Sequence, residues 1–137
     1  MKVRIEQERL GPTDDPDLHL KLGRGSLSDI EFTVQLLQLR HRVPEASTMA
    51  ALAALEELGH LPAEEADVLE ASYRFCEGAR NRTYLVVGSG DALPVRPELA
   101  TPIARSLGVT VSELREQYRR VTRRARRVVE RRFYGRG

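Results

Sequence analysis

The residues of this sequence best suited to chemistry lie together in the stretch HLKLGRGSLSDIE, residues 19–31. Two glycines, Gly23 and Gly25, enclose Arg24, and Lys21 stands just before them. A glycine turn that leads into a helix presents backbone N–H groups and the positive end of the helix dipole, which suits a phosphate group. The stretch is therefore compatible with a phosphate-binding turn. From the residues alone a structural turn with solvated basic side chains is favoured, because two glycines without a third form a weak motif.

Two carboxylates, Asp29 and Glu31, follow this turn. Residues two apart on a helix point about 200° away from each other. Both carboxylates can therefore reach one metal ion only if the helix begins after Asp29. The local alternative is a capping box, since Ser28 and Glu31 have the spacing with which a serine and a glutamate close the start of a helix.

The elements that must position these groups are mostly helical. Residues 18–22 alternate apolar and polar side chains, which predicts a short, half-buried strand. A lone strand needs a pairing partner, so it suggests a piece of a larger sheet. Apolar spacing, prolines and capping residues predict a short helix at residues 2–10 and five further helices. The first four of those helices are expected at residues 27–43, 47–58, 62–87 and 97–107, and the last follows a capping box at Thr110 and Glu113 with an apolar seam that runs to Val128. The predicted fold class is an all-α bundle of about five helices, with the short N-terminal helix and the single strand as appendages.

Two helices carry polar residues that need explanation. On the first long helix a polar stripe runs between two apolar flanks, so we expect a largely buried helix whose stripe faces a cleft or a partner. Exposure at a narrow edge is the alternative. The stripe consists of Glu31, Gln35, Gln38 and Arg42, and the second flank of Phe32, Leu36 and Leu39. Arg80 falls on the apolar seam of the 62–87 helix, and we expect it to pair with Asp29, Glu31 or Glu77.

The composition limits the class of protein. A length of 137 residues with 41% hydrophobic residues is enough for one domain with a core. The single cysteine, Cys76, is expected in that core, and its isolation favours a reducing, cytoplasmic setting. No signal peptide and no apolar run of about 20 residues is visible, so no membrane association is expected. His19, His41 and His60 lack metal-ligand spacing, so no metal site is predicted.

The net charge of +2 conceals a local concentration of arginine. Residues 1–110 sum to −5 and residues 111–137 to +7, and eight of the fourteen residues from Arg119 to Arg132 are arginine. The apolar seam of this last helix is short, so we expect it to pack on the bundle with its arginines outside. They form either a solvated face or a protein docking surface. The docking residues would be Arg119, Arg120, Arg123, Arg124 and Arg127. Nucleic acid is a less favoured ligand, because no aromatic residues interleave with the arginines.

The stretch LKLGRGSLSDIEFTVQLLQLRH resembles the pattern K-x-G-x-G-G-x-x-D-I-E-F-x-V-Q, which follows the nucleotidyltransferase fold in glutamine-synthetase adenylyltransferases. The related nitrogen-signalling uridylyltransferases have a looser version of it. The similarity continues through STMAALAALEELGHLPAEEADVLEASYRF and YRRVTRRARRVVERRFYG and so covers nearly the whole chain. Ser26 replaces the usual third glycine, and FCEGARNRTYLVV is a loose match.

The resemblance implies part of an enzyme that transfers AMP from ATP to a tyrosine of glutamine synthetase and removes it again. In that family two nucleotidyltransferase halves each hold magnesium and the triphosphate with paired aspartates after a glycine-serine turn. No such motif is present here, so we expect a chain that is catalytically incomplete and binds neither ATP nor Mg²⁺ alone. Residues 1–25 would be the edge of the catalytic domain and residues 26–137 the helical bundle behind it.

Within the whole enzyme, the resemblance implies that the glycine turn holds phosphates and that the carboxylates border the active site. The phosphate-holding residues would be Lys21, Gly23, Arg24 and Gly25, and the bordering carboxylates Asp29 and Glu31. The implied partners are glutamine synthetase and the upstream catalytic domains of the same enzyme, with a nitrogen-signalling regulator left open. The alternative is a stand-alone helical module that binds nucleic acid or an acidic protein through the C-terminal arginines.

Overall fold

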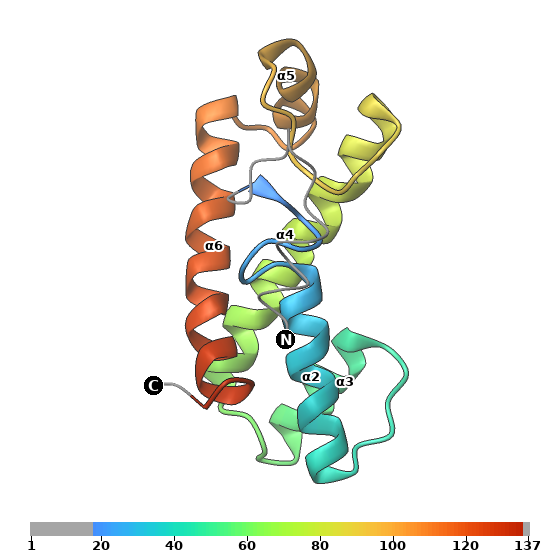
Figure 1. The fold of residues 1–137 in the computed structure, drawn as a ribbon, viewed down its shortest axis with the longest axis vertical. Helices are drawn as coiled ribbons and strands as arrows, with labels where there is room; N and C mark the ends of the chain where they lie inside the picture. Colours follow the sequence, from blue (N-terminus) through green and yellow to red (C-terminus); the bar gives the residue numbers. More distant parts are fainter. Residues whose placement is uncertain (1–17, 136–137) are drawn as a thin grey trace.

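The computed structural model describes residues 18–135, and this part of the chain folds into five helices without a sheet (Figure 1). The helices are α2 (Leu27–His41), α3 (Thr48–Glu57), α4 (Ala63–Val87), α5 (Pro97–Ser106) and α6 (Val111–Arg132). The all-α prediction is confirmed. The helix predicted at residues 2–10 lies outside the described residues. None of the described helices has the length and apolar character needed to span a membrane.

Most helix ends follow the local signals in the sequence. The Ser47 hydroxyl accepts the N–H of Ala50 at the start of α3. Thr110 and Glu113 form the predicted capping box at the start of α6. Gly88 ends α4 in the left-handed conformation with φ 86°. These ends depend on residues within one turn of each other, which is why the sequence alone locates them.

The strand predicted at residues 18–22 is wrong. Only His19 makes a β-bridge, an isolated antiparallel pair with Ala92. Directly after it the chain turns back, because the N–H of Leu22 donates to His19 Nδ1 at 2.9 Å and the N–H of Gly23 to the His19 carbonyl at 3.0 Å. His19 is buried together with the leucines on either side of it. The apolar–polar alternation therefore did not mark one buried and one exposed face.

The core consists of two apolar clusters stacked along the two longest helices, α4 and α6. The first cluster joins α2 and α3 to the start of α4 and the end of α6. The second joins residues 18–27 and α5 to the remainder of α4 and α6. Leu18 and Leu20, from the predicted edge of the catalytic domain, thus pack inside the bundle. A domain boundary at residue 25 stays a prediction.

The single cysteine lies in the second cluster. Cys76 is fully buried, as expected from its place on the seam of α4. Burial raises the pKa of its thiol to about 12, because the thiolate would lose its hydration. Burial and a raised pKa are typical of a structural cysteine, and Cys76 packs in the core.

The exposed side of α2 differs from the prediction. Phe32 is 42% and Leu39 79% exposed, so the second apolar flank is not buried in the bundle. Three members of the polar stripe nevertheless line a groove of about 550 Å³ beside the end of α2. The groove is lined by Gln35, Gln38, Leu39, Arg42, Val43, Pro44 and Glu45. The stripe therefore faces a groove, although the helix around it is only half buried.

Arg80 does form an ion pair, but with a different partner from those expected. Its guanidinium lies 3.5 Å from the carboxylate of Asp91, in the loop after α4, and both side chains are partly exposed. The end of α4 packs against residues 18–20 and α5 in the second cluster, whereas most of α2 belongs to the first. Asp29 is instead bonded to Gly25 and Arg126.

The contact between α2 and the α3–α4 connection predicts a dependence of stability on pH. The rings of His41 and His60 stack with centroids 3.9 Å apart and 10° between their planes. Desolvation, followed by the neighbouring charges of His60 and Arg40, lowers the pKa of His41 from 6.5. The folded state then binds fewer protons than the unfolded state, so this contribution to stability is complete above pH 6.5 and declines as the pH falls through that value.

This prediction can be measured by following the His41 ring by NMR over the range pH 4 to 8. In His60→Phe a ring remains available for stacking but cannot be charged, so we expect the pKa of His41 to rise. The melting temperature should also become less sensitive to pH below 6.5. An unchanged pKa of His41 in this variant would show that His60 has no influence on it.

Candidate functional site

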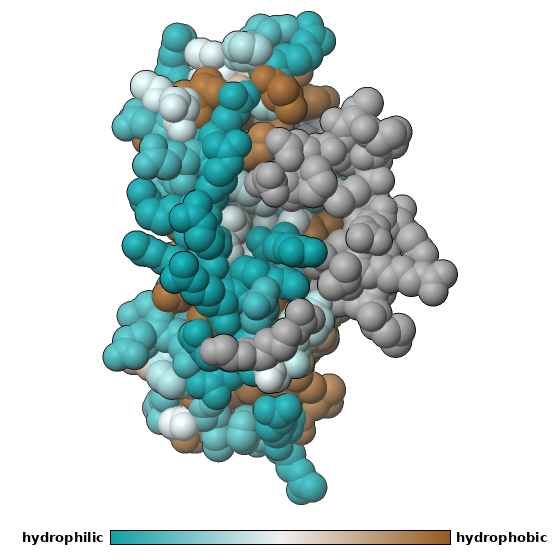
Figure 2. All heavy atoms as spheres, turned by 60° about the vertical axis from the view of Figure 1, so that its left-hand side comes forward, coloured by the Kyte–Doolittle hydropathy of each residue, from teal (hydrophilic) through white to brown (hydrophobic). Residues whose placement is uncertain are grey.

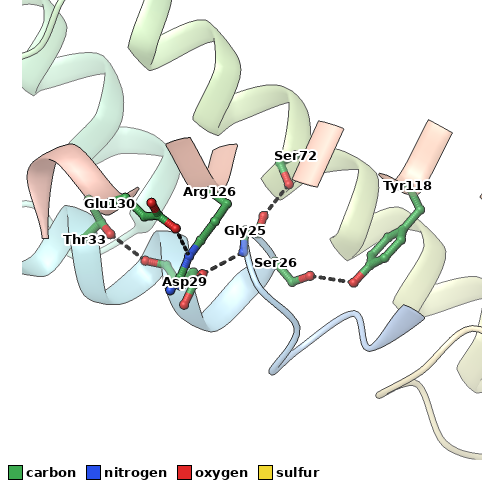
Figure 3. A network of polar contacts seen from close by, with 8 residues as sticks. All are labelled: Gly25, Ser26, Asp29, Thr33, Ser72, Tyr118, Arg126 and Glu130. Atoms are coloured by element: carbon green, nitrogen blue, oxygen red, sulfur yellow. Dashed lines mark hydrogen bonds and ion pairs between the residues drawn. The ribbon is translucent and has the colours of Figure 1, made fainter. Parts of the chain in front are cut away.

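Between the two apolar clusters lies a layer of polar groups that we call the polar joint (Figure 3). It consists of Gly25, Ser26, Asp29, Thr33, Ser72, Tyr118, Arg126 and Glu130. Along α4 the first cluster ends at Leu69 and the second begins at Cys76. The predicted glycine turn enters the bundle at this level. Its buried backbone needs hydrogen-bond partners inside the protein.

Gly25 is the point where the turn passes closest to α6. Its φ of +76° lies in the left-handed region, and a Cβ added there would overlap the carbonyl oxygen of Thr122. Its N–H donates to Asp29 Oδ2 at 2.6 Å, and its carbonyl accepts the Ser72 hydroxyl at 2.6 Å. Gly25 therefore satisfies three demands at once: backbone conformation, close approach and hydrogen bonding.

Asp29 connects this turn to α6. Its side chain is fully buried, and Oδ2 also accepts a bond from Arg126 Nη1 at 2.8 Å. Arg126 further contacts Glu130, with 3.2 Å between its Nε and the carboxylate, and lies over the ring of Tyr134 at 4.9 Å. Burial opposes the charge of Arg126, but the hydrogen bond and the charge of Asp29 outweigh it and raise the pKa of the guanidinium.

The capping box predicted for Ser28 and Glu31 is wrong. Helix α2 begins at Leu27, so Ser28 already lies inside it, and its N–H donates to the Lys21 carbonyl at 2.9 Å. The start of α2 has no side-chain cap, and Asp29 instead accepts the N–H of Gly25, the residue before the N-cap Ser26. Since the helix begins before Asp29, Asp29 and Glu31 point in different directions. Glu31 is partly exposed, whereas Asp29 is not exposed at all.

A second connection runs from α6 to the segment before the turn. The Tyr118 hydroxyl donates to the His19 carbonyl at 2.9 Å and lies 3.0 Å from the Ser26 hydroxyl. A phenol has one proton to give, so Ser26 is the donor in its contact with Tyr118. One residue of α6, Tyr118, thus holds both the backbone of His19 and the side chain of Ser26.

The residues predicted to hold phosphates are divided by the structure. Gly23 and Gly25 direct their N–H groups to His19 and Asp29 within the chain. The side chain of Arg24 is exposed and that of Lys21 partly so. The basic side chains therefore remain available for an anion, whereas the backbone of the turn serves the fold. Their binding of phosphate stays a prediction.

A magnesium site does not fit the described residues. Residues 18–135 contain no cluster of three or more histidine, cysteine or acidic side chains that can hold a metal ion. Asp29, the buried carboxylate nearest the turn, is already bonded to Gly25 and Arg126. We derive no catalytic step through a metal in this part of the chain.

The arginines of α6 divide into two groups. The five predicted docking residues are exposed. Arg126 and Arg132, however, turn inward, so the expectation that all the arginines lie outside is wrong. Arg132 binds Glu65 of α4 through two hydrogen bonds of 2.7 and 2.8 Å. This hydrogen bonding lowers the pKa of the Glu65 carboxyl despite partial burial.

Sequence analysis did not find the partners of the turn. Ser72 is a small polar residue on the buried side of α4, and Arg126 lies at the border of the α6 seam beside Ala125. Their positions in the sequence indicate that they are buried. That they bond to Gly25 and Asp29 is determined only when α2, α4 and α6 pack together. No spacing in the sequence links residues 47 and 97 positions apart.

The fold and the polar joint define a helical bundle domain whose first helix is fastened at a buried glycine turn. The model of the GlnD PII-uridylyltransferase family matches residues 1–133, and the chain belongs to this family.

Curated relatives carry the name bifunctional glutamine synthetase adenylyltransferase/adenylyl-removing enzyme. The protein from Streptomyces avermitilis is 44% identical over 144 residues, which cover 98% of this chain and 14% of that protein. The proteins from Nocardia farcinica and Leifsonia xyli are 43% and 44% identical over 97% and 98% of the chain. The chain spans only 14% of the length of each of these two relatives as well.

Proposed function

We propose that this chain is the helical part of an enzyme that transfers AMP from ATP to a tyrosine of glutamine synthetase and removes it again. The observation that carries this proposal is the 44% identity over 98% of the chain to an enzyme named for both reactions. In this proposal the chain supplies a helical bundle that holds the glycine turn in place, and another part of the enzyme supplies the catalytic groups. The described residues include no group of side chains that could bind a metal ion.

In this proposal ATP and magnesium belong to the catalytic part of the whole enzyme. Magnesium there neutralises charge on the triphosphate. The contribution of this chain is to hold Lys21 and Arg24 at the border of that site. The polar joint supports this role, since Gly25 is fixed on both sides by Asp29 and Ser72. Asp29 acts on the position of the turn, and Glu31 stays a candidate for the border itself.

The first test is that the isolated chain transfers no AMP. Incubated with magnesium, α-labelled ATP and glutamine synthetase, residues 1–137 are expected to leave the synthetase unlabelled. The full-length protein should label it, and Lys21→Ala and Arg24→Ala within that protein should raise the KM for ATP. Labelling by the isolated chain would contradict the proposed division of labour. No labelling by the full-length protein would contradict the proposed reaction.

A second candidate reaction is uridylyl transfer, which the description of the matching family favours. The same assay separates the two reactions when α-labelled UTP and PII replace ATP and glutamine synthetase. We expect the full-length protein to prefer ATP, because the relatives that match almost the whole chain are named adenylyltransferases. A preference for UTP and PII would favour uridylyl transfer over adenylyl transfer.

A further inference from the structure

The exposed side of α6 carries a continuous set of arginines that we call the arginine ridge. It consists of Arg119, Arg120, Arg123, Arg124, Arg127 and Arg131, all of which are exposed. Figure 2 shows hydrophilic side chains running along this side of the molecule. Helical geometry places these six residues within an arc of about 140°. Four of them recur every fourth residue, so their Cα atoms follow one another at about 6 Å over about 18 Å.

The charges of the arginine ridge are not paired within the described part of the chain. Within residues 18–135, none of its guanidinium groups forms an ion pair with a carboxylate. Arginines whose Cα atoms follow one another at about 6 Å bring like charges together, and such charges repel one another within the screening length of about 8 Å in physiological salt. A ligand with several negative charges in a row would relieve this repulsion.

The inward-facing arginines of the same helix show which anion such a guanidinium takes in this protein. Arg126 binds the carboxylate of Asp29 at 2.8 Å, and Arg132 binds both oxygens of Glu65. Each fastens α6 to a carboxylate on a neighbouring helix. The planar guanidinium matches a carboxylate in this paired geometry. The outward-facing row offers the same groups at similar levels of the helix to a partner outside the bundle.

We propose that the arginine ridge is a docking surface for a separate polypeptide that presents a row of carboxylates on one face of a helix. Glutamates or aspartates at every fourth position have the same spacing of about 6 Å as the row from Arg119 to Arg131. A protein is favoured over nucleic acid for two reasons. No described aromatic side chain interleaves with the ridge, and Glu113 and Glu116 stand exposed at its N-terminal end. This surface does not depend on the proposed AMP transfer.

The test uses residues 1–137 and a helical peptide of about 20 residues, long enough to fold alone in an alanine-rich background. In the aligned peptide glutamate recurs at every fourth position. In the control peptide the same glutamates are spread around the helix. We expect the aligned peptide to bind about fivefold tighter in low salt, because only its carboxylates face the ridge together. Fluorescence anisotropy measures both affinities.

The variant that tests the surface is the triple replacement Arg119→Glu, Arg123→Glu and Arg127→Glu. We expect it to lower the affinity for the aligned peptide at least about tenfold, since three attractions become repulsions. The matched control reverses three exposed arginines elsewhere, Arg40, Arg74 and Arg105, with the same change in net charge. It is expected to change the affinity less than about twofold.

Five outcomes would overturn the proposal. The first is equal binding of the two peptides, and the second is unchanged binding by the ridge variant. The third is a sharp fall in the melting temperature of the ridge variant, which would mean that the ridge stabilises the fold. The fourth is tighter binding of a random DNA duplex than of the aligned peptide at physiological salt, which would identify a nucleic-acid surface. Light scattering that shows self-association through the ridge would name a second copy as the partner and would contradict the proposal equally.

Discussion

Replacing Gly25 by alanine is expected to lower the free energy of unfolding by about 3–5 kcal/mol, one of the largest effects of a single added methyl group in this protein. The left-handed φ of +76° disfavours any side chain. The added Cβ would overlap the carbonyl oxygen of Thr122 and lie 2.8 Å from its carbonyl carbon. Both atoms belong to the backbone of α6, so the helix or the turn must move. The hydrogen bonds of Gly25 to Asp29 and Ser72 would then be distorted.

The measurement is thermal and urea unfolding followed by circular dichroism, with a fall in melting temperature of about 10–20 °C expected for a domain of this size. Gly59→Ala is the matched control, because Gly59 has a φ of +80° but nothing lies within 4 Å of its added Cβ. The control carries the conformational cost alone, about 1 kcal/mol. Equal losses of unfolding free energy in Gly25→Ala and Gly59→Ala would show that the contact with α6 adds nothing to the cost of a side chain at position 25.

Replacing Arg126 by methionine is expected to cost about 3 kcal/mol, because it removes the charged partner of a fully buried carboxylate. Asp29 would keep its bond from Gly25 but would lose the charge of Arg126. The stem of methionine preserves much of the packing, so the loss reports on charge. Arg127→Met is the control on the exposed side of the same helix. It should change the free energy of unfolding by less than about 0.5 kcal/mol.

A double-mutant cycle with Asp29→Asn separates the ion pair from the capping bond. Asparagine keeps an oxygen for the N–H of Gly25 and carries no charge to be balanced. We expect the double variant Asp29→Asn/Arg126→Met to be more stable than the sum of the two single losses predicts, by about 2 kcal/mol. Additive losses of unfolding free energy would show that Asp29 and Arg126 stabilise the fold independently. The ion pair between them would then not be what stabilises the polar joint.

These variants also bear on function. If the proposed function holds, a weakened polar joint should displace Lys21 and Arg24 and lower the affinity of the whole enzyme for ATP, because their turn depends on Gly25 and Asp29. The arginine ridge should be unaffected, since its residues lie on the opposite side of α6 from the apolar seam. Loss of ATP affinity without loss of peptide docking would therefore distinguish the two surfaces of this chain.

The sequence by itself determined the helices and most of their ends. The seams of α4 and α6, the capping box of Thr110 and Glu113 and the stop at Gly88 all depend on contacts within a few residues. Such contacts leave a regular pattern in the sequence. The same kind of pattern misled at residues 18–22, where both sides of the segment are buried and alternation carries no information about a strand.

Only the tertiary structure decided which groups Gly25 and Asp29 contact. Gly25 and Asp29 have the residue types of a phosphate-binding turn with an acidic border, but Thr122, Ser72 and Arg126 give both of them structural partners. These partners come from two other helices and are 47 to 97 positions away in the chain. A sequence pattern records spacing along one element. The roles of these buried polar groups were instead fixed when three helices packed at one level and each backbone group needed a partner.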